Sequence, residues 1–257
     1  MNIPQLKTHF AQGKVLFNML LSSGDPFFAE ITGRSGFPSV MIDMQHGLQH
    51  ADRLLPILQA LPDSVIPLVR IPWNDPAAAM KALDAGAAGV VCPMINNATE
   101  AQAFVQACHY PPKGIRSFGP IRAQYLGQQP DYFASARDHF LTAVMIETAQ
   151  ALEDIDAIAA LEGLDMLYAG PFDLSVSLQR PQRANFQDPV LIAALERILE
   201  AARAAGKYTA VFTVNEADAR RAIDMGFNMV SYGTDTGLFA KTVQHAIQQL
   251  QGFIAQP

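Results

Sequence analysis

Two acidic residues, Glu147 and Asp173, each follow an apolar run that is typical of a buried β-strand. Two carboxylates held close together repel each other, and the pKa of one rises unless a cation lies between them. No lysine is near either acid in the sequence, so the simplest cation is a divalent metal ion. Carboxylates completed by substrate and water oxygens suit octahedral Mg²⁺ or Mn²⁺ better than tetrahedral zinc. The alternative is that Asp173 caps the helix that follows it.

A second polar group follows an apolar run at Met41–Gly47, which reads MIDMQHG. His46 is a candidate general acid or base, because the ordinary pKa of imidazole is close to neutrality. Asp43 precedes it, and Gly47 permits a tight turn that a side chain would obstruct. The alternative is a strand end that is capped by polar loop residues.

Arg70 ends another apolar run, where a permanent cation needs an anionic partner. That partner is a substrate carboxylate or carbonyl oxygen or, alternatively, the carboxylate of Asp43 or Asp75. Asp84 closes a predicted helix, although the helix dipole disfavours an acid at that end. A local rule broken without evident gain suggests a function, such as orienting His46, and the alternative is a solvated turn.

Eight apolar runs resemble buried strands and alternate with helix-like segments. They span residues 15–21, 39–44, 65–70, 89–94, 141–147, 166–170, 208–213 and 229–234. This repetition predicts an α/β fold, a (β/α)8 TIM barrel that forms one domain over residues 1–257. A doubly wound open sheet would need a glycine-rich phosphate loop after the first strand, and residues 21–24 (LSSG) do not form one. In a barrel, the C-terminal strand ends meet at one mouth, so distant polar residues can meet there.

Three Asp-Pro pairs, at residues 25–26, 75–76 and 188–189, predict helix N-caps followed by proline in the first turn.

The segments between and after these elements carry further expectations. Residues 109–140 are too long for a plain βα loop and are a candidate lid, or else a solvated linker to a short helix near 131–138. Residues 173–187 form a second long connection. The tail, residues 238–253, is predicted to be an amphipathic helix that packs on the barrel or on a neighbouring subunit.

Composition excludes several classes of function. The net charge is −6 without a Lys/Arg cluster, so nucleic acid and anionic membranes are not expected partners. No apolar run approaches the ~20 residues of a membrane span, and no signal peptide is evident. Cys92 and Cys108 fit buried thiols, which suits the cytoplasm. None of the six lysines falls at a predicted strand C-terminus, which argues against a Schiff-base aldolase.

Six stretches together resemble the metal-dependent pyruvate aldolases of the aldolase/citrate lyase superfamily. They are IDMQHG (42–47), VRIPWND (69–75), KALDAGAAGVVCPM (81–94), YPPKGIRSFGPIRA (110–123), MIET (145–148) and YAGPFDLSVSL (168–178). The group includes 4-hydroxy-2-oxoheptanedioate aldolase and 2-keto-3-deoxy sugar acid aldolases. The stretches run through most of the chain in the expected order.

This resemblance implies a metal site and a pyruvate site. Glu147 and Asp173 would hold Mg²⁺, Mn²⁺ or Co²⁺, and pyruvate would chelate the ion through its carboxylate and keto oxygens. Arg70 would stabilise the enolate beside the keto oxygen. The backbone N–H groups of Phe172 and Asp173 would receive the pyruvate carboxylate, and Asp43 would hold water on the metal.

The resemblance also implies a proton-transfer group and an assembly. His46 would move the proton of the substrate C4 hydroxyl, with Asp84 of the same or an adjacent subunit orienting it. Such enzymes form homohexamers, trimers of dimers with exchanged C-terminal helices. The chain departs from the family pattern around the pocket, at Leu20, Gln45, Met145 and Phe172, which puts the aldehyde partner in doubt.

The expected activity is a class II lyase that reversibly cleaves a 4-hydroxy-2-oxo acid to pyruvate and an aldehyde. A rival is a lyase or thioesterase for acyl-CoA, which would need a nucleotide-binding surface, but the chain has no basic cluster for one. A second rival is a non-catalytic barrel that binds an oxo acid. Its expected signature is the loss of Glu147, Asp173 or His46, and all three are present.

Overall fold

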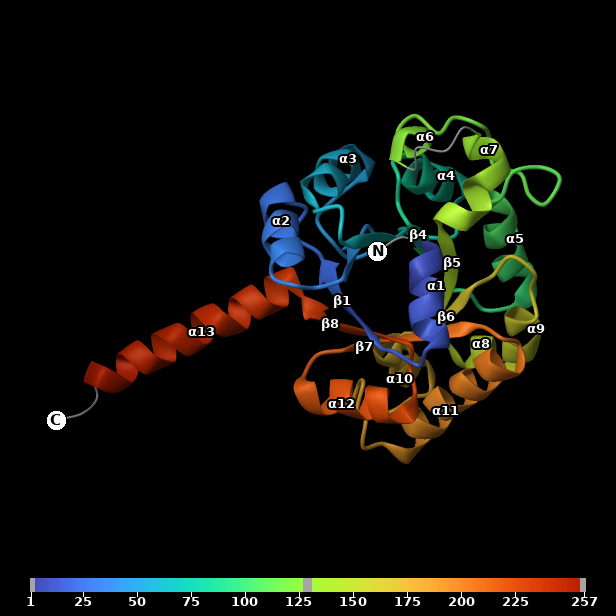
Figure 1. Cartoon of the computed structure of the whole chain (residues 1–257). Coiled ribbons are helices and arrows are strands. Elements are labelled where there is room, and N and C mark those ends of the chain that lie inside the picture. Colours follow the sequence, from blue (N-terminus) through green and yellow to red (C-terminus); the bar gives the residue numbers. More distant parts are fainter. Residues whose placement is uncertain (1–2, 127–130, 255–257) are drawn as a thin grey trace.

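The computed structural model describes residues 3–126 and 131–254. A closed barrel of parallel strands in sequential order, β1 to β8, forms its centre, with helices around it (Figure 1). The strands are β1 Leu16–Leu21, β2 Ser39–Asp43, β3 Ile66–Arg70, β4 Gly89–Cys92, β5 Leu141–Ile146, β6 Met166–Ala169, β7 Tyr208–Thr213 and β8 Met229–Thr234. The predicted (β/α)8 barrel is confirmed, and each strand begins and ends within two residues of its predicted run.

The barrel has an inner and an outer apolar layer because alternate residues of each strand point inward and outward. Inward side chains such as Leu68 and Met145 form one buried cluster, and outward ones pack against the helices. Helix α1 (Ile3–Ala11) precedes β1 and adds Phe10 to the inner cluster, with its ring 4.9 Å from that of Tyr208. Since Tyr208 begins β7, α1 closes the N-terminal end of the barrel, and the C-terminal end can hold a site.

The predicted helix starts are confirmed by their caps. The carboxylates of Asp25, Asp75 and Asp188 accept backbone N–H bonds at 2.7, 2.9 and 2.9 Å, and a proline follows each. These caps begin α2 (Pro26–Arg34), α4 (Pro76–Asp84) and α11 (Pro189–Ala204). The other helices of the barrel wall are α3 Ala51–Ala60, α5 Ala98–Cys108, α8 Ala149–Glu153, α9 Ile155–Ala159, α10 Pro171–Ser177 and α12 Glu216–Met225.

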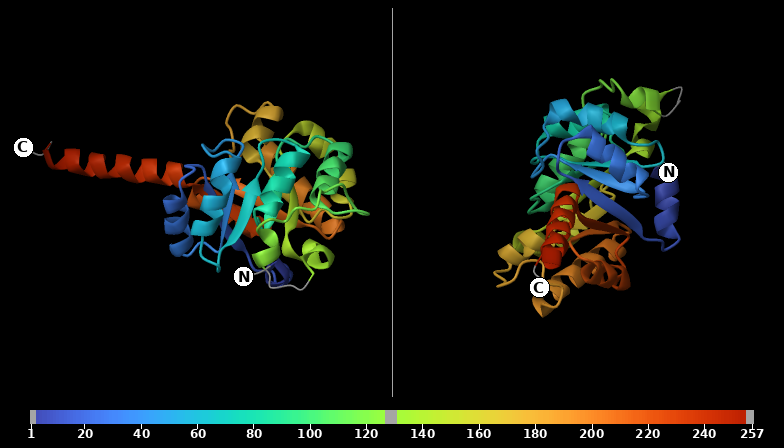
Figure 2. Two further views of the ribbon diagram at one scale, coloured as in Figure 1. Left: turned by 90° about the horizontal axis from the view of Figure 1, so that it is seen from above. Right: turned by 90° about the vertical axis from the view of Figure 1, so that its left-hand side faces the viewer.

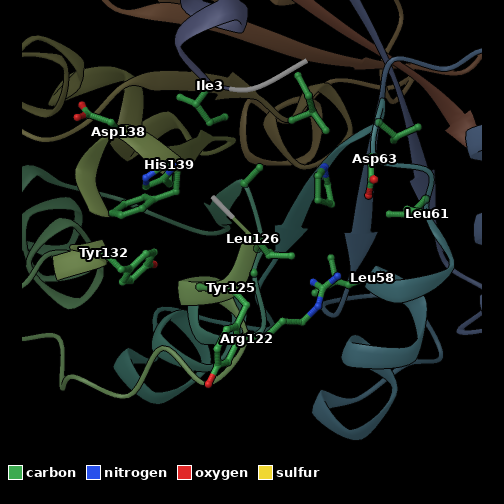
Figure 3. Close-up of a pocket in the computed structure, with 18 of the residues that line it drawn as sticks. Ile3, Leu58, Leu61, Asp63, Arg122, Tyr125, Leu126, Tyr132, Asp138 and His139 are labelled. Atoms are coloured by element: carbon green, nitrogen blue, oxygen red, sulfur yellow. The ribbon is translucent and has the colours of Figure 1, made fainter. Parts of the chain in front are cut away.

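The segment predicted as a lid lies at the wrong end of the barrel to cover the mouth of this protomer. It connects α5 to the start of β5 and holds α6 (Ala123–Leu126), α7 (Tyr132–Ser135) and the 3₁₀ turn η1 (Ala136–His139). Together with α1 and the α3–β3 loop, it lines a cavity of about 890 Å³ at the N-terminal strand ends (Figure 3). The prediction treated the segment as a loop from a strand to a helix, which would lie at the C-terminal end of the barrel. The segment instead runs from a helix to a strand, and such connections lie at the N-terminal end.

The C-terminal helix α13 (Asp235–Ile254) leaves the barrel and extends away from it (Figures 1 and 2). Its first turns touch the barrel wall, where the rings of Phe28 and Phe239 lie 6.1 Å apart. Beyond them the predicted apolar face is exposed, with Ile247 at 49% and Leu250 at 56% exposed. The predicted helix is therefore confirmed. Only its first turns pack on the barrel of its own chain, and packing on a neighbouring subunit stays a prediction.

Cys92 and Cys108 are buried free thiols, as predicted. Among the described residues, no helix combines the length and the apolar character needed to cross a membrane.

Candidate active site

A cavity of about 430 Å³ opens at the C-terminal ends of the strands. It contains all but one of the side chains that the sequence singled out for chemistry, and Asp84 is the exception. Its lining residues are Leu20, Ser22, Asp43, His46, Arg70, Met145, Glu147, Tyr168, Gly170, Pro171, Phe172, Asp173, Phe212, Thr234 and Thr236. The larger cavity at the other end contains none of the predicted site residues.

Asp43 and Arg70 form a two-pronged ion pair at the cavity wall. They are register partners at the ends of β2 and β3, and Arg70 donates from Nε and Nη2 at 2.9 and 2.7 Å. Burial alone would lower the pKa of Arg70, but the bond and charge of Asp43 outweigh it and raise that pKa. Of the proposed anionic partners, Asp43 is confirmed, whereas Asp75 instead caps α4.

The third guanidinium nitrogen of Arg70 is left for the cavity. Nη1 has the sulfur of Met145 3.7 Å away, which is at most a weak acceptor. Arg70 can therefore hold Asp43 and still donate one bond to an oxygen in the cavity. Arg70 can thus bind Asp43 and a substrate oxygen at the same time, because its planar guanidinium group points its nitrogens in different directions.

The loop after β2 brings His46 to the rim of the cavity. Oδ1 of Asp43 accepts the backbone N–H groups of Gln45 and His46 at 3.1 and 3.3 Å. The buried amide of Gln49 bonds the carbonyl oxygens of Leu21 and Asp43, tying β1 to β2. These contacts fix the backbone of the loop, while the imidazole of His46 is exposed.

Gly47 is required in this loop because there is no space for a side chain. A Cβ atom there would lie 2.1 Å from the carbonyl oxygen of Asp43 and 2.6 Å from the amide nitrogen of Gln49. The predicted tight turn is confirmed, and its cause is the close approach of backbone and amide.

Glu147 is a buried acid, 1% exposed, directly after β5. Its pKa is raised to about 7, mainly by burial and also by the charge of Asp173, while the N–H bond from Met94 and the charge of Arg70 lower it in part. The backbone N–H of Met94 donates to Oε1 at 2.7 Å. Oε2 lies beside Gly170, where a Cβ atom would be only 2.4 Å from it. Glu147 is thus held by one oxygen, and a glycine makes room for the other.

Asp173 lies in the first turn of α10, which begins directly after β6. The N-cap position is Gly170, so the alternative interpretation of Asp173 as a helix cap is wrong. The first N–H of α10 with a partner inside the helix is that of Leu174, which bonds the carbonyl oxygen of Gly170. The N–H groups of Phe172 and Asp173 come before it in the first turn, where helix N–H groups have no partner within the helix. The predicted long connection at 173–187 therefore begins within a helix, α10.

The donor set fits an open divalent-metal site. Among the described residues no group of three or more His, Cys, Asp or Glu side chains could enclose an ion. As two ligands, Glu147 and Asp173 would leave most positions of such an ion for substrate and water oxygens, as Mg²⁺ prefers. The raised pKa of Glu147 marks a buried acid beside a second acid, which a cation would relieve.

Asp84 lies at the far end of the barrel from His46. It is the last residue of α4, whose C-terminus leads back to the start of β4. Its carboxylate accepts a 2.7 Å bond from the fully buried side chain of Arg116. Within one protomer Asp84 does not orient His46, and contact with a neighbouring subunit's histidine stays a prediction.

Sequence reasoning did not single out several residues that line the cavity. Tyr168 and Phe212 lie on β6 and β7 with inward-facing side chains, and the two-residue strand period could have predicted them. Ser22, Thr234 and Thr236 carry hydroxyl groups at the rim. Thr234 and Thr236 lie where β8 passes into α13, and no local sequence pattern predicts where their side chains point.

The chain is similar to several known proteins over most of its length. The HpcH/HpaI aldolase/citrate lyase family matches residues 16–242. A hydroxypyruvate/pyruvate aldolase of Rhizorhabdus wittichii is 33% identical over 244 residues, 95% of this chain and 97% of that protein. A 4-hydroxy-2-oxo-heptane-1,7-dioate aldolase of Salmonella arizonae is 36% identical over 232 residues, 89% of this chain and 88% of that protein. The crystal structure of an HpcH/HpaI aldolase/citrate lyase family protein from Burkholderia cenocepacia superimposes with a TM-score of 0.88 at 28% identity, covering 96% and 99% of the two chains.

Proposed function

The chain belongs to the HpcH/HpaI aldolase/citrate lyase family and is a lyase, and from this we propose that it cleaves a 4-hydroxy-2-oxo acid to pyruvate and an aldehyde. The reverse reaction is the aldol addition of pyruvate to that aldehyde. The single observation that carries the proposal is that Glu147, Asp173, His46 and Arg70 line one cavity, and that Nη1 of Arg70 is not used by Asp43.

The reaction needs two proton movements and a site for negative charge. In the cleavage direction the C4 hydroxyl loses a proton, and the C3–C4 bond breaks to release the aldehyde. The electron pair goes to C3, giving the enolate of pyruvate, which then takes up a proton at C3. No electrons are gained or lost overall, so the proposal needs no redox cofactor.

The side chains of the cavity have separate roles in this proposal. His46, at the rim, accepts the proton of the C4 hydroxyl. Arg70 donates from Nη1 to the keto oxygen, where charge gathers, and donors of this kind typically contribute about 3–4 kcal/mol. The N–H groups of Phe172 and Asp173 bind the carboxylate, because the N-terminus of a helix attracts anions.

Glu147 and Asp173 would hold the divalent ion, Mg²⁺, Mn²⁺ or Co²⁺. When bound, such an ion supplies positive charge beside the oxo-acid oxygens. No lysine lines the cavity in the described part of the chain, which supports a mechanism without a Schiff base.

The exposed apolar face of α13 supports an exchange of this helix between subunits. We propose a homo-oligomer, a hexamer arranged as a trimer of dimers, in which the barrel acts as one domain. A neighbouring subunit would then supply Asp84 to His46. The buried free thiols of Cys92 and Cys108 are consistent with a cytoplasmic enzyme.

Pyruvate release from a 4-hydroxy-2-oxo acid tests the proposed function. A chelator should abolish release, and Mg²⁺, Mn²⁺ or Co²⁺ should restore it. Borohydride with pyruvate should leave no covalent adduct on the protein by mass spectrometry. Activity that survives chelation would contradict the metal site, and a trapped lysine would show the wrong class of aldolase.

A further inference from the structure

Two neighbouring loops, one after β4 and one after β5, hold the carboxylate of Glu147. Met94 lies in the first loop and donates its backbone N–H to Oε1 of Glu147 at 2.7 Å. Thr148 directly follows Glu147 in the second loop and is the N-cap residue of α8. Because β4 and β5 are paired strands, the two loops leave the barrel next to each other. The position of the carboxylate therefore depends on how firmly Met94 and Thr148 are held together.

The side chain of Asn96 connects the two loops. Its amide nitrogen donates to the carbonyl oxygen of Met94 at 3.0 Å, and its amide oxygen accepts the hydroxyl of Thr148 at 2.8 Å. Because the Met94 carbonyl can only accept, the nitrogen of the amide must face Met94 and the oxygen must face Thr148. Asn96 therefore bridges the residue that donates to Glu147 and the residue that follows Glu147.

The hydroxyl of Thr148 fits this arrangement without conflict. It gives its one proton to the amide oxygen of Asn96 and still accepts the backbone N–H of Ala151 at 3.1 Å. Each group between Met94 and Thr148 has one compatible role as donor or acceptor. The hydrogen bonds of the bridge therefore have a single direction.

The backbone of Met94 needs a restraint from its surroundings. Its φ is +54°, in the left-handed region that a residue with a side chain rarely adopts. Such conformations persist where the surrounding structure enforces them, and they are common at functional sites. The N–H of Met94 bonds Glu147 and its carbonyl bonds Asn96, so both polar groups of this residue are used. Without the Asn96 bond, Met94 could relax and turn its N–H away from Glu147.

Helix α5 anchors Asn96 itself. Glu100, in the first turn of α5, accepts the backbone N–H of Asn96 at 2.8 Å, and the amide nitrogen of Asn96 lies 3.4 Å from the same oxygen. Glu100 is fixed in turn by Asn97, which accepts its N–H at 2.9 Å and donates to its Oε1 at 3.2 Å. Asn96 is thus held by the protein alone, before any ion or substrate binds.

The alternative is that the side chain of Asn96 only caps a helix, and its contacts argue against this. Helix α5 is already capped by Asn97, whose side chain accepts the N–H of Glu100. Helix α8 is capped by Thr148. The bonds from Asn96 to Met94 and Thr148 therefore serve the two loops around Glu147.

We propose that Asn96 is a positioning residue of the metal site, which holds Met94 and Thr148 so that Glu147 keeps the orientation needed to bind a divalent ion. The inference rests on the proposed function and adds a residue that acts through Glu147. Asn96 is not among the described residues that line the cavity, so it acts from behind the ligand. Removal of groups that orient a metal ligand typically weakens metal binding by about 10–100-fold.

The first test is the affinity of the metal-free, full-length protein for Mn²⁺, measured by isothermal titration calorimetry without substrate. In Asn96→Ala the dissociation constant should rise about 10–100-fold, because Glu147 is no longer fixed. Asn215→Ala is the matched control, because Asn215 caps α12 and its side chain bonds only Asp218 among the described contacts, at 2.8 and 2.7 Å. An unchanged affinity in Asn96→Ala, or an equal loss in both variants, would overturn the inference.

Variants of Thr148 test the other end of the bridge. Thr148→Val removes the hydroxyl and should weaken Mn²⁺ binding, whereas Thr148→Ser keeps the hydroxyl and should bind nearly as the wild type does. Because Thr148→Val also removes the cap of α8, circular dichroism first establishes a temperature at which the variant is folded, and the affinity is measured there. Wild-type affinity in Thr148→Val, or a loss in Thr148→Ser as large as in Thr148→Val, would overturn the inference.

A double-mutant cycle tests whether Asn96 acts through Glu147. Glu147→Gln alone should weaken Mn²⁺ binding. Adding Asn96→Ala to it should change the affinity by no more than about threefold, since the ligand that Asn96 positions is already impaired. A further loss as large as in the wild-type background would show that Asn96 acts elsewhere in the fold, and would overturn the inference.

The same measurements separate this inference from the proposed function. Weak binding in Glu147→Gln with wild-type binding in Asn96→Ala would overturn the inference and leave the metal site standing. Equal affinities in the wild type and Glu147→Gln would overturn both. Weak binding in both variants, without any pyruvate release by the wild type, would overturn the aldolase reaction and leave the role of Asn96 standing.

Discussion

The carboxylate of Glu147 accepts a hydrogen bond of 2.7 Å from the backbone N–H of Met94, a residue whose φ is +54°. Left-handed backbone costs a non-glycine residue about 1–2 kcal/mol. Met94 adopts it two residues after β4 ends, where its N–H points at Oε1 of Glu147. One oxygen of the buried acid is therefore fixed, and the chemistry of the site depends on how the acid responds to protons and metal.

The raised pKa of Glu147 should make the stability of the protein depend on pH. Its folded pKa of about 7 lies above the ordinary 4.5, so the folded state holds this proton more tightly than the unfolded chain. The protonated Glu147 therefore adds about 3 kcal/mol to the free energy of unfolding. This contribution is fully present below about pH 4.5 and is lost as the pH rises through 7. The free energy of unfolding of metal-free protein, relative to Glu147→Gln, should fall over this range in denaturant titrations. A constant difference from pH 5 to 8 would contradict it.

Metal binding should have the opposite pH dependence. The ion needs the ionised carboxylate, so the affinity for Mn²⁺ should rise as pH increases toward and past 7. Isothermal titration calorimetry without substrate measures this affinity. Glu147→Gln should bind at least tenfold more weakly at pH 8. If the variant binds Mn²⁺ as the wild type does, Glu147 is not a ligand.

Replacing Arg70 by lysine should impair catalysis although the charge is kept. Lysine cannot donate two bonds to Asp43 and a third into the cavity from a fixed plane. We expect kcat/KM for pyruvate release to fall about 100-fold or more, comparable to the loss of one oxyanion donor. Arg197→Lys is the matched control, because Arg197 pairs with Asp156 on the surface. Comparable losses in both variants would argue against a role for the Arg70 geometry.

Removal of the His46 imidazole should slow carbon–carbon cleavage far more than it weakens pyruvate binding. A general base of this kind contributes about 10²–10⁴ in rate. Steady-state cleavage kinetics and inhibition by pyruvate separate the two effects in His46→Ala. His50→Ala is the control, since His50 is exposed and makes no side-chain cap bond to α3. Equal losses of cleavage and pyruvate affinity would make His46 a binding residue.

Gly170→Ala should displace Glu147. The added Cβ would lie 2.4 Å from Oε2 and 2.8 Å from Cβ of Glu147, so the acid must move. Overpacking of this kind costs about 1–3 kcal/mol, and Mn²⁺ affinity should fall at least tenfold. Gly252→Ala is the control, because its Cβ would meet nothing within 4 Å. Wild-type stability and metal affinity in Gly170→Ala would show that the contact is not tight.

A charge in the apolar face of α13 should break the proposed assembly. Leu250 is 56% exposed within the protomer, so Leu250→Glu costs little if the helix stays free. If the face is buried against a partner, an unpaired charge there should shift the mass measured by light scattering to smaller species. Gln248→Glu places the same charge on the opposite face of the helix and should leave the mass unchanged. An unaltered mass in both variants would contradict helix exchange.

The sequence by itself determined the barrel, the helix caps and most of the candidate site. Strand type follows from local apolar patterns, and Asp-Pro pairs cap helices through contacts two residues apart. Parallel strands share one direction, so polar residues such as Asp43, Arg70 and Glu147, at or directly after strand C-terminal ends, had to gather at one mouth. These inferences need only local order and chain direction, which a sequence contains.

Only the tertiary structure decided which residues face one another. Asp43 pairs with Arg70 because the register of β2 and β3 sets them opposite, and Thr234 enters the cavity because β8 shifts by one residue. The segment 109–140 was predicted to cover the mouth from its length, and Asp84 was predicted to orient His46 of its own or an adjacent subunit. Within this chain both lie at the far end of the barrel, because Asp84 ends helix α4 and the segment follows helix α5. Register and the route of each connection arise from closure of the whole barrel, so no local pattern encodes them.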